Sequence, residues 1–70
     1  MYYLIHFTVK GLDEQEKIEK LRNSVLAVKG VKEIRFIGSN KVSVTYDPTK
    51  VVPSVLTSIM IAHGLKGHRG

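Results

Sequence analysis

The chain has 70 residues, a net charge of +5 and no cysteine, so it is one domain, 1–70, without disulfides, thiolate nucleophiles or zinc–thiolate sites. The positive charge favours acidic partners, although the lysines and arginines are scattered and form no run. We expect a cytoplasmic domain without membrane insertion, because there is neither a basic leader before an apolar run nor a stretch of membrane-spanning length.

The first half of the chain predicts a strand followed by a helix. Residues 2–10 alternate, and one face carries Tyr3, Ile5, Phe7 and Val9. Asp13 is the predicted N-cap of the helix, with Glu16 at the capping-box position. Helical spacing then predicts an apolar stripe of Ile18, Leu21, Val25 and Val28. Residues 29–30, Lys-Gly, are the predicted end of this helix.

The second half predicts two strands around a turn at 38–40, a second helix and a short last strand at 65–68. Pro53 suits the first turn of the helix, whose predicted core face is Val52, Val55, Leu56 and Ile59. The order βαββαβ predicts an α+β, ferredoxin-like sandwich, with a four-stranded antiparallel sheet and two helices on one face. The predicted core consists of Ile5, Phe7, Val9, Leu21, Val25, Val44, Leu56 and Met60.

Several spaced motifs run through almost the whole chain. They are Val9-Lys10-Gly11-Leu12, Gly30-Val31, the group Val42, Val44, Tyr46, Asp47 and Pro48, and finally Leu56, Met60 and Gly64-Leu65. With this set the chain resembles the heavy-metal-associated domains, which occur as small metallochaperones and as N-terminal modules of metal-pumping ATPases. The resemblance implies the ferredoxin-like fold and a link to metal transport.

The family metal loop is degenerate in this chain. Glu14 and Lys17 stand where the family has the two cysteines of its Cys-x-x-Cys motif, while Leu12 replaces the usual methionine and Leu65 the usual aromatic residue. Cu(I) and Zn(II) bind well to thiolates, and a carboxylate with an ammonium group does not replace that pair. The resemblance therefore implies the family fold without its metal site, and we expect no cofactor. The acidic cluster of Asp13, Glu14 and Glu16 is predicted to stabilise the helix start rather than hold a hard cation.

Three functions remain open, and none is enzymatic, because no nucleophile with a base, phosphate loop or carboxylate pair is recognisable. The preferred one is a non-catalytic binding module with a protein-interaction or regulatory role. The first alternative is metal binding through non-cysteine ligands, for which His6 and His68 lie on strands expected to be neighbours. The second is anion or nucleic-acid binding. Nucleic acid is disfavoured because the outward residues of the third strand, Lys41, Ser43 and Thr45, include no aromatic ring for stacking.

The second helix supplies the candidate interface. No charged residue occurs from Val51 to Ala62, whereas a solvent-facing helix normally carries charge. The side opposite the predicted core face carries Ser54, Thr57, Ser58 and Ile61. We expect this face to contact a protein partner or a second copy in a weak homo-oligomer; the alternative is an ordinary small polar face with one exposed isoleucine.

Overall fold

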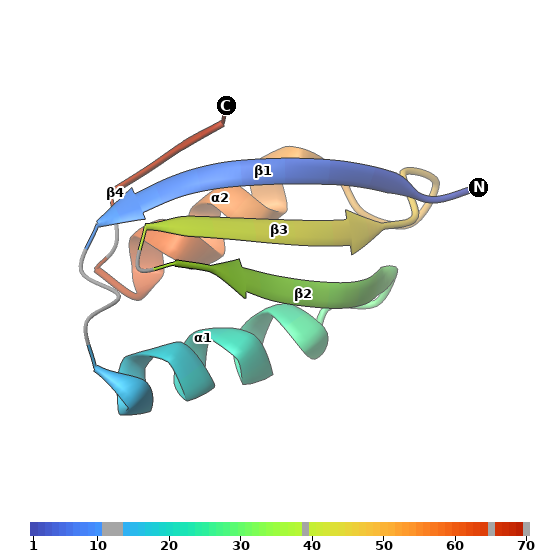
Figure 1. Ribbon diagram of the computed structural model, residues 1–70. Coiled ribbons are helices and arrows are strands. Elements are labelled where there is room, and N and C mark those ends of the chain that lie inside the picture. Colours follow the sequence, from blue (N-terminus) through green and yellow to red (C-terminus); the bar gives the residue numbers. More distant parts are fainter. Residues whose placement is uncertain (11–13, 39, 65, 70) are drawn as a thin grey trace.

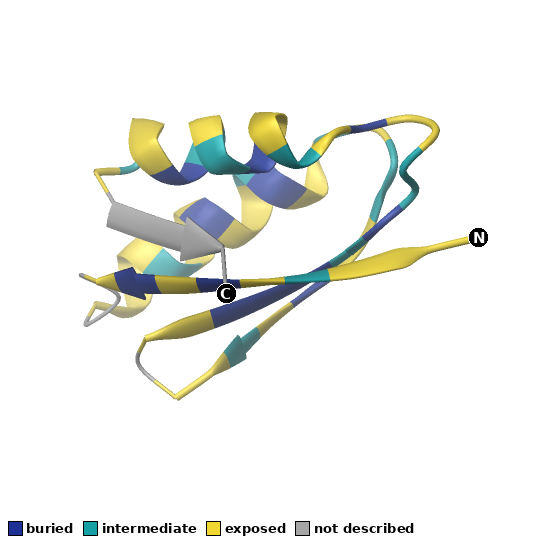
Figure 2. Cartoon of the chain, turned by 90° about the horizontal axis from the view of Figure 1, so that it is seen from above, coloured by how far each residue is buried: buried dark blue, intermediate teal, exposed yellow. Residues whose placement is uncertain are grey.

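The computed structural model describes residues 1–10, 14–38, 40–64 and 66–69, the last four by their backbone only. The elements in chain order are β1 (Tyr3–Lys10), α1 (Gln15–Leu26), β2 (Val31–Ile37), β3 (Lys41–Tyr46), α2 (Pro53–Ala62) and β4 (Lys66–Arg69) (Figure 1). The antiparallel sheet has β3 between β1 and β2, and the short β4 backbone pairs with the other edge of β1. Both helices lie on one side of the sheet, as Figure 2 shows. The predicted α+β arrangement of two helices on an antiparallel sheet is therefore confirmed.

The alternation along β1 and β3 determines which side of the sheet is covered. Ile5 pairs with Val44 and Phe7 with Val42, so the apolar positions of the two strands coincide on the helix-covered face. The intervening positions point to the opposite face, which no helix covers in the described part of the chain (Figure 2). On β2 the register slips between Val31 and Glu33, which leaves Lys32 as the extra residue of a bulge.

The core forms between the sheet and the two helices. It contains Phe7, Val9, Leu21, Val25, Ile34, Val42, Val44, Tyr46, Val51, Leu56 and Met60. Of the predicted core residues only Ile5 differs, since it is half-buried and packs against this cluster from the side. The predicted core face of the second helix is wrong in part, because Val52 and Val55 are exposed. Val52 is the N-cap of α2, and the helix is rotated so that Leu56 and Met60 face the sheet, with Val51 filling the space before the first turn.

The ends of α1 also differ from the sequence-based expectation. Its N-cap is Glu14, whose side chain makes no capping hydrogen bond, and Asp13 lies outside the described residues. The helix ends at Leu26, before the expected residues 29–30. The chain then turns into β2 through Gly30, whose φ of 103° is in the region that favours glycine. Neither helix in the described residues is long and apolar enough to cross a membrane.

Candidate functional site

The start of α1 contains Glu14 and Lys17, two of the four residues that the sequence analysis assigned to a degenerate metal loop. Glu14 is the N-cap and Lys17 lies three residues later in the first turn, with both side chains exposed to solvent. The turn itself is formed, because the Ile18 amide donates to the Glu14 carbonyl at 3.2 Å. Leu12 and Leu65, the other two residues assigned to this loop from the sequence, lie outside the described residues. The two positions that the resemblance assigned to cysteines thus hold a carboxylate and an ammonium group, three residues apart at the helix start.

The charges around this helix start are arranged for stability. Glu16 pairs with Lys20 one turn later, Oε1 to Nζ at 3.2 Å, and both side chains are largely exposed. Such an exposed pair contributes ~0.3–0.5 kcal/mol. In the described part of the chain no three carboxylate, imidazole or thiol groups come together as a cation site would require. Asp13 lies outside the described residues, so the stabilising role of the acidic cluster stays a prediction.

The three histidines occupy separate places. His6 is exposed on the open face of β1, opposite Ser43 of β3. The backbone of His68 pairs with Thr8, two residues farther along β1, so the register makes His6 and His68 diagonal rather than direct neighbours. His63, at the end of α2, has its Nε2 atom 2.8 Å from the Ser24 hydroxyl of α1. Sequence analysis missed this contact between the helices, because no local pattern connects residues 39 positions apart.

The α2 outer face, defined as Ser54, Thr57, Ser58 and Ile61, is less polar than its sequence suggests. The Thr57 hydroxyl donates to the Pro53 carbonyl at 3.2 Å, and the Ser58 hydroxyl donates to the Ser54 carbonyl at 2.9 Å. The donor hydrogens of both hydroxyls are therefore already bonded to carbonyls of the helix backbone. Ile61 is 65% exposed, whereas Thr57 is half-buried. The exposed Val55 extends this uncharged surface along the helix.

The open face of the sheet contains a second feature, which the sequence patterns did not indicate. Pairing aligns Arg35 of β2, Ser43 of β3 and His6 of β1 in one row across the three strands. The row on one side consists of Glu33, Thr45 and Leu4, and the row on the other side of Ile37, Lys41 and Thr8. Ser43, the smallest of these nine side chains, is at the centre, and a hollow of about 340 Å³ lies over it. An isolated serine flanked by larger outward residues on a central strand is the signal that could have indicated it.

Comparison with solved structures shows where this fold occurs. Oxidized MerP from Ralstonia metallidurans CH34 superposes with a TM-score of 0.86 at 17% identity, covering 99% of this chain and 97% of that one. The putative copper-ion-binding protein from Bacillus anthracis gives 0.90 at 17% identity and 97% coverage of both chains. The N-terminal domain of a potential copper-translocating P-type ATPase from Bacillus subtilis, solved in the Cu(I)-loaded state, gives 0.90 at 18% identity, with 99% and 88% covered.

Comparison of the amino-acid sequence, by contrast, finds no relative. No family model matches the chain, and no curated protein sequence matches it. Identities of 17–18% establish a common fold and leave the function open. The chain therefore shares its α+β fold with metal-binding proteins of similar size, while containing no cysteine of its own.

Proposed function

We propose that this chain is a non-catalytic binding module, related to the heavy-metal-associated domains, that has lost the cysteine metal site and works by protein–protein contact in the cytoplasm. In this proposal β4 completes a ferredoxin-like sheet, and the domain keeps the fold of its relatives without carrying their cargo. The single observation that supports a contact role is the α2 outer face, where an uncharged helix surface presents Ile61 to solvent.

The chemistry of this face favours a protein partner over plain solvation. Two of its hydroxyls are already hydrogen-bonded to the helix backbone, so covering them does not strip an unsatisfied donor from water. Their side chains are also short, which permits close approach of a second backbone. Burial of Ile61 would contribute ~1.5–3 kcal/mol. Since association costs ~4–15 kcal/mol, Ile61 anchors only a weak contact unless neighbours such as Val55 are covered as well.

The metal-carrier alternative has less support. Its best pair, His6 and His68, offers two imidazoles in a diagonal register, whereas a zinc site needs three or four protein ligands. The printed descriptions of several structural neighbours name copper binding, but the loop of this chain has no sulfur to repeat that chemistry.

Sedimentation over a concentration series tests the contact role. The natural chain is expected to show weak, concentration-dependent self-association, and Ile61→Lys is expected to remain monomeric and folded. The matched control is Asn23→Lys, which adds the same charge at an exposed position of α1. If Asn23→Lys abolishes association equally, net charge rather than the α2 outer face is responsible. If the natural chain is monomeric throughout, the self-association form of the proposal is wrong.

A further inference from the structure

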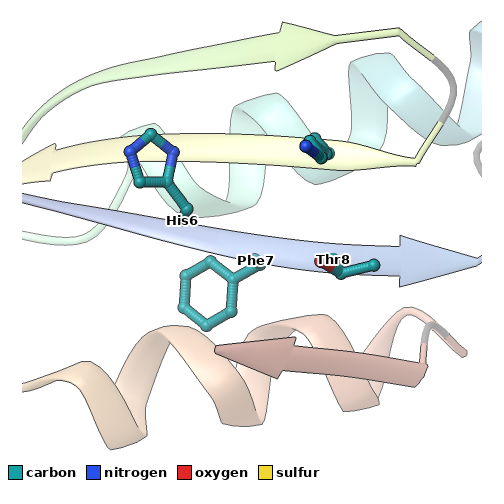
Figure 3. A pocket seen from close by; sticks show the side chains of 4 residues that line it. His6, Phe7 and Thr8 are labelled. Atoms are coloured by element: carbon teal, nitrogen blue, oxygen red, sulfur yellow. The ribbon is translucent and has the colours of Figure 1, made fainter. Parts of the chain in front are cut away.

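The hollow over Ser43, hereafter the Ser43 hollow, is lined by residues that point away from the helices and is independent of the α2 outer face. Figure 2 shows that both helices lie on the other side of the sheet. A second hollow, of about 310 Å³, adjoins it at His6 and is bordered by Thr8 and Lys41. Figure 3 looks into this second space and shows the His6 ring lying across β3. A volume of about 340 Å³ is at the lower end of the ~300–1,000 Å³ that small-molecule sites occupy.

Hydrogen-bond donors surround the Ser43 hollow and are only partly used. Ser43 is 6% exposed, and its hydroxyl makes no hydrogen bond to another described side chain or backbone group. The Nε atom of Arg35 donates a hydrogen bond to Oε1 of Glu33 at 3.2 Å. Within the described residues the terminal nitrogens of its guanidinium have no other hydrogen bond. A planar guanidinium with two free terminal nitrogens suits bidentate binding of a carboxylate or phosphate.

A cation next to the hollow also favours an anion. Within the lining the charge of Arg35 is balanced by Glu33, whereas Lys41, which borders the adjoining second hollow, is a further cation. Because Glu33 contacts Arg35 from the row away from Lys41, the positive charge is concentrated between Arg35, Ser43 and Lys41. Anionic oxygens would be attracted to this part of the rim.

Two apolar side chains complete the rim and indicate the rest of the ligand. Leu4 is 59% exposed and Ile37 is 49% exposed, and the pairing places them at opposite corners of the three rows. They offer contact to a short apolar body next to the charged group. Among the nine side chains the imidazole of His6 is the one aromatic ring, so the hollow lacks the row of stacking platforms that a single-stranded nucleic acid would use.

We propose that the Ser43 hollow binds a small organic anion, with one carboxylate or phosphate group on a short apolar body. The anionic oxygens accept hydrogen bonds from the Arg35 guanidinium and the Ser43 hydroxyl, and the Lys41 ammonium group attracts them from the adjoining hollow. The apolar body lies against Leu4 or Ile37. Binding here leaves both helices free, so it is compatible with a protein contact on α2.

Amide chemical-shift titration at low salt tests the site on the natural chain. The probes are phenyl phosphate and 3-phenylpropanoate, with inorganic phosphate and benzyl alcohol as controls for charge alone and apolar contact alone. We expect saturable, millimolar binding of at least one organic anion, with shifts confined to residues 4–8, 33–37 and 41–45, and about tenfold weaker binding of both controls. The stronger organic probe identifies the preferred anionic group.

Variants separate a built site from general charge attraction. Arg35→Gln and Ser43→Val are each expected to weaken the better probe about tenfold, the first by removing donors and the second by filling the hollow. Lys17→Gln removes the same charge from α1, on the far side, and should leave the affinity unchanged. If Ser43→Val does not fold, the affinity of Arg35→Gln for the better probe, compared with that of Lys17→Gln, tests the site.

Three results would overturn the proposal. They are equal losses in Arg35→Gln and Lys17→Gln, inorganic phosphate binding as tightly as phenyl phosphate, and no saturable binding of either organic anion. A short oligothymidylate that binds more tightly than both probes at the same amides would replace the small anion with a single-stranded nucleic acid.

Discussion

Replacing Gly30 by alanine is expected to destabilise the domain far more than the same change at Gly64. Gly30 has φ of 103°, and a Cβ there would lie 2.7 Å from Cβ of Lys50 and 3.3 Å from Cγ1 of Val51. Its carbonyl also accepts a hydrogen bond from the Asp47 amide at 2.7 Å, so the loop cannot move away without losing this contact. Gly64 has φ of 75°, and no atom of the described residues lies within 4 Å of its added Cβ, so the backbone cost is the expected loss.

The two costs can be separated because the glycines differ in packing. An alanine in a left-handed conformation costs ~1–2 kcal/mol, which is the expected loss for Gly64→Ala. Gly30→Ala adds an overpacking cost of ~1–3 kcal/mol, for a total of ~2–5 kcal/mol. The whole domain has ~3.5–10 kcal/mol of stability at ~0.05–0.15 kcal/mol per residue. Alanine at Gly30 thus removes a large fraction of it.

Urea denaturation followed by far-UV circular dichroism measures both variants against the natural chain. We expect the midpoint order natural chain, Gly64→Ala, then Gly30→Ala, with similar slopes for all three proteins. Equal midpoints for the two variants would refute the reasoning, because they would show that the close approach of Lys50 and Val51 carries no energetic weight. The result also bears on the Gly-Val pair at 30–31, since this packing gives a physical reason for glycine before β2.

Three further predictions concern the core, the proposed loss of a metal site and the stability of the domain at acid pH. Leu21 is completely buried, so Leu21→Ala should cost ~2–5 kcal/mol; an unchanged thermal midpoint would contradict its place in the core. The natural chain should bind Cu(I) or Zn(II) with a Kd no better than about micromolar, and Glu14→Cys with Lys17→Cys should bind at least about a hundredfold more tightly. The matching double serine variant should behave like the natural chain, and equally tight Cu(I) binding by the natural chain would disprove loss of the site. Hydrogen bonds from the Thr49 hydroxyl and amide hold the pKa of Asp47 below its ordinary value of 3.8. The ionised Asp47 therefore stabilises the fold fully above pH 3.8, and this stabilisation is lost as the pH falls through the lowered pKa. Asp47→Asn should make the free energy of unfolding less dependent on pH in the acid range. An unchanged pH dependence in this variant would contradict the prediction.

The two candidate binding surfaces lie on opposite layers of the molecule. The α2 outer face offers an uncharged helix surface with one strongly exposed isoleucine, and the Ser43 hollow offers donors and positive charge on the open sheet face. Neither surface includes Glu14 or Lys17. Variants at Ile61 and Arg35 therefore test the two proposals independently, and failure of one leaves the other intact.

The sequence by itself determined the element order and most of the core. Strict alternation along residues 41–46 specifies a strand with one apolar face, and the spacing of Leu21 and Val25 specifies a helix stripe, because each periodicity is a local property of the backbone. The absence of cysteine likewise excludes thiolate ligands for a metal without reference to any structure. These inferences depend on residues close together in the chain.

Only the tertiary structure decided the rest. Local periodicity allowed Val52 and Val55 to count as core, but the rotation of α2 over the sheet depends on how Leu56 and Met60 pack against distant strands. The Ser43 hollow exists because strand pairing brings Arg35, Ser43 and His6 into one row, and a register shifted by one residue would place Ser43 beside different neighbours. The contact between His63 and Ser24 also requires the two helices to pack against each other. Helix rotation, strand register and helix–helix packing are set by contacts between remote segments, which no pattern within a single element encodes.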